Sequence, residues 1–131
     1  LNLRSENFVC SVLACSSEKI KGLNAQFRGK NNCTNVLSFP SKAEKFDTKI
    51  GLKFKANADP LELGDIAIAY EVCEKEANVS KIKFEDHVYH LIIHSVLHLL
   101  GYDHEEKINA TEMEKIEVQV LANLGISNPY L

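Results

Sequence analysis

The stretch that decides the fold covers residues 94–104 and reads His94-Ser-Val-Leu-His98-Leu-Leu-Gly101-Tyr-Asp-His104. His94 and His98 are four positions apart, so on a helix their rings lie on one face, one turn apart. Gly101 is suited to ending that helix, because glycine adopts the left-handed backbone conformation that other residues avoid. The chain after the glycine can then bring His104 back toward the same point, and we expect the three imidazoles to lie together.

Three imidazoles on one rigid corner are typical of a metal site. They suit Zn²⁺, with metal–nitrogen distances of about 2.0–2.1 Å, although Ni²⁺, Co²⁺ and Cu²⁺ also accept imidazole. Three protein ligands leave a fourth position open, which is the arrangement of a catalytic rather than a structural zinc. The competing interpretation is three unrelated histidines near a buried helix. The spacing around a helix-ending glycine favours a metal site made of His94, His98 and His104.

The residue after the first histidine limits the chemistry of this site. Metzincin proteases share the spacing His-x3-His-x2-Gly-x2-His, but they carry a Glu after the first His, and this Glu is their general base. Here the position is Ser95, which is not basic at neutral pH. Zinc alone lowers the pKa of bound water to about 7. A phosphodiester, whose transition state needs charge neutralisation, therefore suits the site better than a peptide.

A phosphodiester also requires a cationic partner, and arginine matches phosphate geometry best. The chain has two arginines, Arg4 near the N-terminus and Arg28 in a predicted helix-to-strand turn, with Lys30 two residues further on. Taken alone, an arginine in a turn is usually a solvated surface residue. Arg28 is nevertheless the better candidate, because residues near a terminus are often poorly ordered.

Other polar residues near the histidines have more than one possible role. Asp103 can orient a ligand imidazole or cap the turn, and Tyr102 can donate a hydrogen bond or simply pack. A ligand trio of His90, His94 and His98 would extend over about 12 Å, too far for one tetrahedral ion. His90 is therefore interpreted as a neighbour of the site or as a hydrogen-bonded core residue.

Composition indicates one globular domain over residues 1–131. The chain is 45% hydrophobic and 25% charged, with a net charge of −3, which is ordinary for such a domain. Residues 1–60 carry a net charge of +5 and residues 61–131 carry −8. The sequence has no apolar run near the roughly 18 residues of a membrane span. Its four cysteines are scattered, which favours reduced thiols in a cytosolic protein.

Hydrophobic periodicity and turn residues predict the elements of an α+β fold. Strands are expected first and helices mostly last, which predicts helices over one face of a small sheet, with the metal at the end of a buried central helix. Thr111 and Glu114 could form a capping box in the last helix. Residues 41–60 suit either an exposed hairpin arm or a loop. The predicted strands cover 8–15, 36–39 and 61–69, and the predicted helices cover 17–27, 71–78, 84–100 and 109–124.

Three separate motifs together resemble the YbeY family of bacterial endoribonucleases, which act in ribosomal RNA maturation. The first is the histidine motif of residues 94–104. The other two read Arg28-Gly-Lys-Asn-Asn-Cys-Thr-Asn-Val-Leu-Ser-Phe-Pro40 and Leu63-Gly-Asp-Ile66. With the final helix, these landmarks cover the chain from about Phe8 to Tyr130.

The resemblance implies a small mixed sheet packed against helices, one Zn²⁺ ion held by His94, His98 and His104, and catalytic roles for Arg28 and His94. Arg28 would face the scissile phosphate, and Lys30 would also bind substrate. The implied activity is single-strand-specific endoribonuclease, acting in 3′-end processing of 16S ribosomal RNA and in ribosome quality control. The implied partners are ribosomal RNA and the small ribosomal subunit with its associated proteins, in the cytoplasm. Neither DNA nor a membrane is an expected partner.

Within residues 8–131, the chain departs from the family pattern at two places. The family usually has Gly at the position of Ser95, and residues 41–60 are longer than expected, either as an RNA-contacting arm or as a surface insertion. Two other functions remain as alternatives. One is a zinc-dependent peptidase, against which Ser95 argues. The other is a non-enzymatic assembly factor that uses zinc to hold its fold and binds the ribosome.

Overall fold

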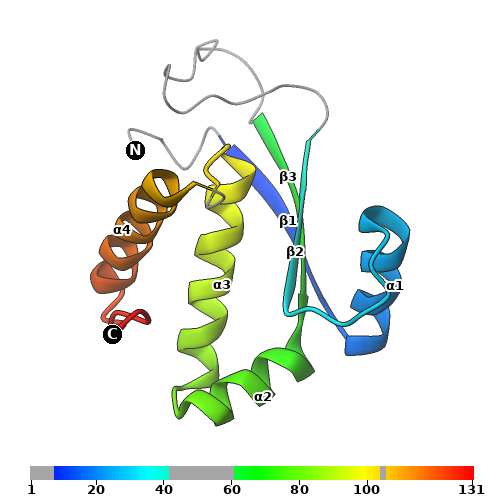
Figure 1. Cartoon of the computed structure of the whole chain (residues 1–131), viewed down its shortest axis with the longest axis horizontal. Helices are drawn as coiled ribbons and strands as arrows, with labels where there is room; N and C mark the ends of the chain where they lie inside the picture. Colours follow the sequence, from blue (N-terminus) through cyan, green and yellow to red (C-terminus); the bar gives the residue numbers. More distant parts are fainter. Residues whose placement is uncertain (1–7, 42–60, 104–105) are drawn as a thin grey trace.

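The computed structural model describes residues 8–41, 61–103 and 106–131, and these form a small mixed sheet with helices on both of its faces (Figure 1). The strands are β1 (Phe8–Cys15), β2 (Val36–Pro40) and β3 (Leu61–Ala69), in the order β1-β3-β2. Strand β3 pairs in parallel with β1 and antiparallel with β2. The predicted α+β class, with a small mixed sheet packed against helices, is confirmed.

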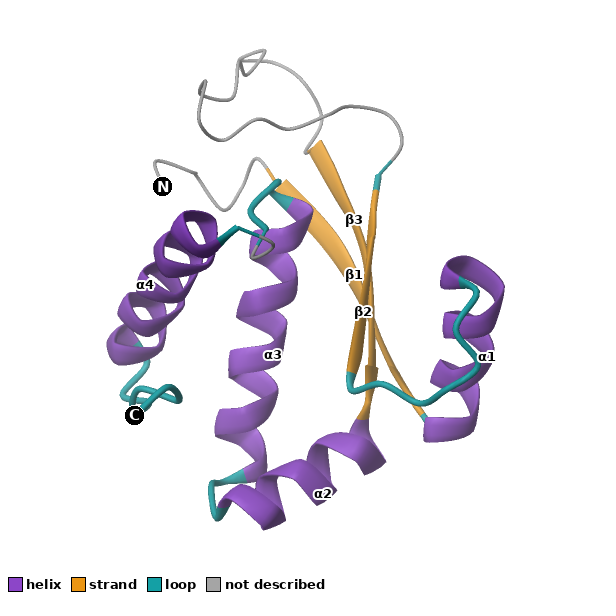
Figure 2. Cartoon of the chain, viewed as in Figure 1, coloured by secondary structure: helices purple, strands orange, loops and turns teal. Residues whose placement is uncertain are grey.

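The helices are α1 (Ser17–Arg28), α2 (Tyr70–Ser80), α3 (Phe84–Leu99) and α4 (Lys107–Asn123). Helix α1 covers one face of the sheet, whereas α3 covers the other and lies between the sheet and α4 (Figure 2). The predicted placement of the helices over one face is therefore wrong. Central strand β3 is the reason, because it buries side chains toward both faces.

The α1 face is built from small residues on β3 and large ones around them. Ala67 and Ala69 are buried there, in one cluster with Ile20 of α1 and Leu37 of β2. The short side chains leave room for the helix to approach the sheet closely. Ile20 is fully buried, and its burial stabilises the contact by about 2 kcal/mol.

The opposite face holds the cluster that supports α3. Ile66 of β3 packs with Leu97 and Leu99 of α3 and with Met113 of α4, and all four are at most 3% exposed. Helix α3 is thus enclosed by the sheet on one side and α4 on the other (Figure 1). The prediction that the histidine-bearing helix is the buried central helix is confirmed.

Helix α1 begins as predicted but ends later than predicted. The hydroxyl of Ser16 caps it by accepting from the Lys19 backbone N–H at 3.1 Å, as N-cap serines do. Gly29 has φ 68°, and its N–H donates to the carbonyl of Ala25. Arg28 is therefore the last residue of the helix rather than part of the following turn.

Helix α3 ends at the predicted place. Gly101 has φ 100°, in the region that favours glycine, and its N–H donates to the His98 carbonyl at 3.0 Å. The N–H of Tyr102 donates to the carbonyl of Leu97 at 3.0 Å. Together these bonds satisfy carbonyls that a helix end would otherwise leave unpaired, and they turn the chain sharply after His98.

The predicted capping box of the last helix is wrong. Helix α4 begins at Lys107, and Thr111 lies inside it, where its hydroxyl donates to the Lys107 carbonyl at 2.9 Å. This bond to the preceding turn is the alternative that threonine adopts within a helix. Met113 and Leu121 face the core as predicted, whereas Leu124 is 54% exposed, because the helix has already ended there.

Some sequence-based predictions fall outside the described residues. These are the interpretation of residues 42–60 as a hairpin arm or loop, the position of Arg4 and the position of His104. Within the described ranges, no helix has the length and apolar character needed to cross a membrane.

Candidate metal site

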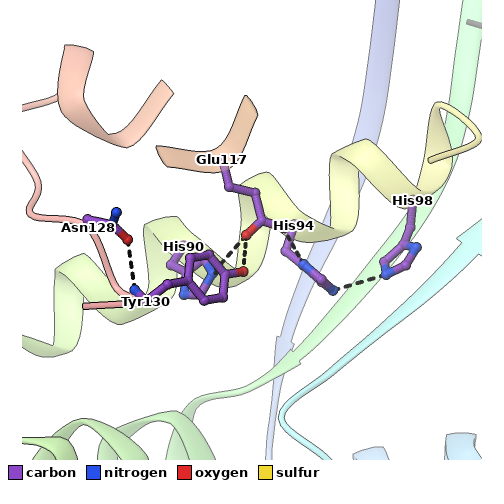
Figure 3. A network of polar contacts seen from close by, with 6 residues as sticks. All are labelled: His90, His94, His98, Glu117, Asn128 and Tyr130. Carbon is purple, nitrogen blue, oxygen red and sulfur yellow. Dashed lines mark hydrogen bonds and ion pairs between the residues drawn. The ribbon is translucent and has the colours of Figure 1, made fainter. Parts of the chain in front are cut away.

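His94 and His98 lie side by side on α3, as their spacing predicts. Their Nε2 atoms are 3.0 Å apart, and the ring centroids are 4.5 Å apart. Both side chains reach toward the same side of the helix (Figure 3). Two ligands of one tetrahedral ion would have their nitrogens about 3.3 Å apart, given metal–nitrogen bonds of about 2.0–2.1 Å. The observed separation is close to that value.

The Nδ1 atom of each ring is held by an acceptor. His94 Nδ1 contacts the carboxylate of Glu117, and His98 Nδ1 lies 3.0 Å from the backbone carbonyl oxygen of Tyr102. Because both partners accept hydrogen bonds, each Nδ1 carries the proton in neutral imidazole and each Nε2 keeps its lone pair. This pattern of an acceptor behind each ligand is what metal-binding histidines show. The two residues therefore fit a Zn²⁺ ion.

Glu117 comes from α4 and was not identified from the sequence. It is fully buried, and its carboxylate accepts hydrogen bonds from His94, His90 and Tyr130. Burial on its own would raise the pKa of Glu117, but these three hydrogen bonds lower that pKa to about 2. The side chain is thus an anion buried beside the imidazole of His94. A signal was present in the sequence, because Glu117 is four residues from both Met113 and Leu121 on the buried face.

Tyr130 and His90 complete the surroundings of this carboxylate. The Tyr130 hydroxyl donates to Glu117, and His90 Nε2 lies 3.1 Å from Glu117 Oε2 and 3.2 Å from the Tyr130 hydroxyl (Figure 3). Burial and the hydrogen bond to Glu117 both raise the pKa of Tyr130, so it stays a neutral donor. His90 is both a neighbour of the site and a hydrogen-bonded residue, and the two interpretations from the sequence are compatible.

The third predicted ligand cannot be placed, because His104 lies outside the described residues. Within residues 8–41, 61–103 and 106–131, no three His, Cys, Asp or Glu side chains gather in a group that could hold a metal ion. The pair formed by His94 and His98 therefore supplies two nitrogen donors. The site lies at the C-terminal end of α3, where the helix dipole favours a cation.

Arg28 opens onto the same groove as the two histidines. The groove is lined by residues from the ends of α1 and α3 and from all three strands, and Arg28, His94 and His98 are among them. Arg28 is exposed at the last position of α1. Lys30 is also exposed, but the residues described as lining this groove do not include it. The structure thus brings Arg28, but not Lys30, to the groove of the histidine pair.

Other predicted neighbours have simpler positions. Ser95 is fully buried, and its hydroxyl has no hydrogen-bond partner among the described residues. Tyr102 contacts His98 through its backbone carbonyl rather than its hydroxyl. Asp103 is exposed and lines the groove, as do the acidic residues Glu62 and Asp65. A serine buried in this way is no general base for an incoming substrate.

Comparisons with known proteins agree on one family. Residues 2–125 match the family model described as "Endoribonuclease YbeY". A protein of that name from Jannaschia sp. (strain CCS1) is 43% identical over 130 residues, covering 99% of this chain and 81% of the relative. One from Ruegeria sp. (strain TM1040) is 45% identical over 134 residues, covering 100% of this chain and 79% of the relative.

A solved structure has the same fold. The solution structure of TM1509 from Thermotoga maritima aligns with a TM-score of 0.57 and 30% sequence identity. The alignment covers 87% of this chain and 66% of that protein. The likeness supports the arrangement of sheet and helices described above.

Proposed function

Because this chain belongs to the endoribonuclease YbeY family, we propose that it is a zinc-dependent endoribonuclease specific for single-stranded RNA. Its proposed role is 3′-end processing of 16S ribosomal RNA and ribosome quality control, in the cytoplasm. The partners we propose are ribosomal RNA and the small ribosomal subunit with its associated proteins, with neither DNA nor a membrane among them. The observation that carries the proposal is the histidine pair, with both Nε2 atoms directed to one point in a groove shared with Arg28.

His94, His98 and His104 are the proposed ligands of the metal. A bound Zn²⁺ ion would act as a Lewis acid that stabilises negative charge on phosphoryl oxygens and lowers the pKa of the water bound to it to about 7. The protein fixes the direction of two of the ligands through Glu117 and the Tyr102 carbonyl. That fixation means that little reorganisation is needed when a substrate arrives.

Arg28 is the proposed phosphate-binding residue. Its guanidinium can donate two parallel hydrogen bonds to the non-bridging oxygens of a phosphodiester, which stabilises charge as it develops in the transition state. Arg28 lines the groove and is exposed, so a strand of RNA can reach it. Lys30, two residues on and exposed, is the proposed contact for a neighbouring phosphate.

The direct test uses purified protein loaded with zinc and two labelled RNAs of one sequence, one single-stranded and one in a duplex. The wild-type protein should cut the single strand and leave the duplex intact. Arg28→Ala and His98→Ala should each lose most of the activity, whereas Lys21→Ala, which removes an exposed cation from the helix that carries Arg28, should keep it. Cleavage at wild-type rates by both site variants would show that the activity comes from a contaminant or another site.

Two alternatives give different outcomes in the same assays. Zinc-dependent turnover of an unfolded protein substrate, without cleavage of RNA, would identify a peptidase. The buried Ser95 argues against this outcome. Restoration of normal ribosomal RNA precursor lengths by an Arg28→Ala protein that lacks nuclease activity would identify a non-enzymatic assembly factor. Our proposal predicts that longer precursors of 16S ribosomal RNA accumulate in cells without the protein. It also predicts that the Arg28→Ala protein does not restore their normal lengths.

A further inference from the structure

We propose that Glu117 and Tyr130 are positioning residues for the metal ligand His94, so that the C-terminal turn of the chain is part of the metal site. This inference rests on the proposed metal centre and deepens it. Both residues lie far from His94 in the sequence. Glu117 comes from α4, and Tyr130 comes from the segment after it. Figure 3 shows both side chains grouped at His94 and His90, on the side away from His98.

The Glu117 carboxylate connects the ligand to the rest of the network. Its Oε1 accepts from His94 Nδ1, and its Oε2 accepts from Tyr130 and from His90 at 3.1 Å. With a hydrogen bond on Nδ1, the ring of His94 has a fixed orientation and keeps its Nε2 lone pair for a metal. Displacement of Glu117 would remove this acceptor from Nδ1 and weaken the preference for the tautomer that leaves Nε2 unprotonated.

Tyr130 holds the carboxylate in that position. A carboxylate that is fully buried is costly unless each oxygen receives hydrogen bonds. Tyr130 lies in a turn that begins at Asn128, where the Tyr130 backbone N–H donates to Asn128 Oδ1 at 2.8 Å and the Leu131 N–H donates to the Asn128 carbonyl at 3.5 Å. Its ring also packs edge-on against His90, with centroids 5.4 Å apart. The turn thus fixes the hydroxyl, and the hydroxyl fixes Glu117.

The geometry ranks the variants that remove these contacts. Glu117→Met keeps a side chain of similar size but removes the acceptor, so it should cost the most. Glu117→Gln keeps an oxygen that can accept from His94, and it should recover part of the loss. Tyr130→Phe removes one of the donors to the carboxylate and leaves the two imidazoles, so its effect should be smaller. Tyr89→Phe is the matched control, because Tyr89 is 51% exposed on the same helix as His94.

The experiment measures zinc affinity of the metal-free proteins by competition with a chromogenic chelator, with thermal melting of the same samples. We expect Glu117→Met to weaken zinc binding by about 10-fold to 100-fold, the range for loss of a residue supporting a ligand. Glu117→Gln should lie between it and the wild type. Tyr130→Phe should weaken binding by about 3-fold to 10-fold, and Tyr89→Phe should not change it.

A second measurement needs no metal. Nitrogen NMR of the histidine rings in their neutral form should show His94 with its proton on Nδ1 in the wild type. Glu117→Met should shift the proton population toward Nε2. Because this tautomer is measured on folded protein, it separates a positioning role from a general loss of stability.

The outcomes distinguish the two proposals. If the wild-type protein binds zinc more tightly than His94→Ala does, but Glu117→Met and Tyr130→Phe match the wild type in affinity and tautomer, the positioning role is refuted and the metal centre stands. If these variants only melt at lower temperature with unchanged zinc affinity, Glu117 and Tyr130 stabilise the fold alone, which also refutes it. If wild type and His94→Ala bind zinc equally weakly, the metal centre itself fails and this inference fails with it.

Discussion

The C-terminal ends of α1 and α3 open onto the same groove, but they are built differently. At the end of α3, His94 and His98 are partly buried, and each ring is held from behind by an acceptor. At the end of α1, Arg28 is the last helical residue and is exposed. Both helices end beside a glycine with positive φ, at Gly29 and Gly101.

The difference follows from what each end is proposed to bind. A metal ion requires ligand atoms in fixed directions, so the surrounding residues must hold the rings in place. A phosphate on a flexible strand is bound well by a long cationic side chain that adjusts to it. The proposed functions therefore call for one end of the groove, at His94 and His98, to be rigid and the other, at Arg28, to be adaptable. Variants at each end test this contrast. Those at the end of α3 should change metal binding, and those at the end of α1 should change substrate binding alone.

Removal of a proposed ligand should have the largest effect. His98→Ala should lower the rate of RNA cleavage by at least about a thousandfold, since the charge stabilisation that zinc supplies amounts to several kcal/mol. It should also abolish tight zinc binding, measured by metal content after dialysis. His87→Gln is the control on the same helix, because His87 pairs with Glu76 at 3.0 Å, away from the groove. Equal zinc content in both variants would show that His98 is not a ligand.

A cavity made under α1 should lower stability without changing zinc affinity, and so distinguish the α1 end of the groove from the α3 end. Ile20→Ala should lower the free energy of unfolding by about 3 kcal/mol, because Ile20 is fully buried against the sheet. Zinc affinity should stay unchanged, since α3 lies on the opposite face. Leu121→Ala is the matched cavity, also fully buried but on α4, one turn from Glu117. It should cost similar stability in urea unfolding and weaken zinc binding as well. Identical zinc affinities in Ile20→Ala and Leu121→Ala would contradict the proposed difference between the two ends of the groove.

Loss of the Arg28 cation at the end of α1 should reduce RNA cleavage without changing zinc binding. Arg28→Ala should lower kcat/KM on single-stranded RNA by about a hundredfold, the cost of removing one stabilising donor in comparable sites. Zinc content should equal that of the wild type. Arg28→Lys should recover only part of the activity, because lysine keeps the charge but lacks the planar pair of donors. A full recovery would mean that charge alone is required.

The smallest expected effect comes from Ser95, which lies between His94 and His98 on α3. The buried Ser95 hydroxyl lacks a hydrogen-bond partner in the described part of the chain. Ser95→Ala should therefore raise the free energy of unfolding by about 1 kcal/mol, by removing an unpaired polar group and improving helix propensity. Nuclease activity should be retained. A loss of activity with unchanged stability would give Ser95 a role in the reaction.

The sequence predicted the elements of the fold well because their ends are marked by particular residues. Gly29 and Gly101 end helices, Ser16 begins one, and strand β2 ends at Pro40. The packing of α1 on the opposite face of the sheet was not predicted, since a strand with small residues such as Ala67 gives no clear sign that a helix covers that face. Packing of this kind depends on contacts between distant segments.

The candidate site was predicted in part for a similar reason. The spacing of His94 and His98 is local, and it correctly predicts that their rings meet. The contact of Glu117 with His94 joins residues 23 positions apart, and the contact of Tyr130 with His90 joins residues 40 positions apart. A glutamate in a helix is usually interpreted as a surface residue, and only its position between Met113 and Leu121 indicates burial. Residues that support a ligand become visible once the helices are packed.

The most direct test of the central claim is a crystal structure of the protein with an excess of zinc. The account predicts one ion bound by Nε2 of His94 and His98 and by His104, at about 2.0–2.1 Å from each nitrogen, with solvent in the fourth position and Glu117 still contacting His94. Imidazole rings that point apart with no ion between them, or a fourth protein ligand that closes the site, would contradict it.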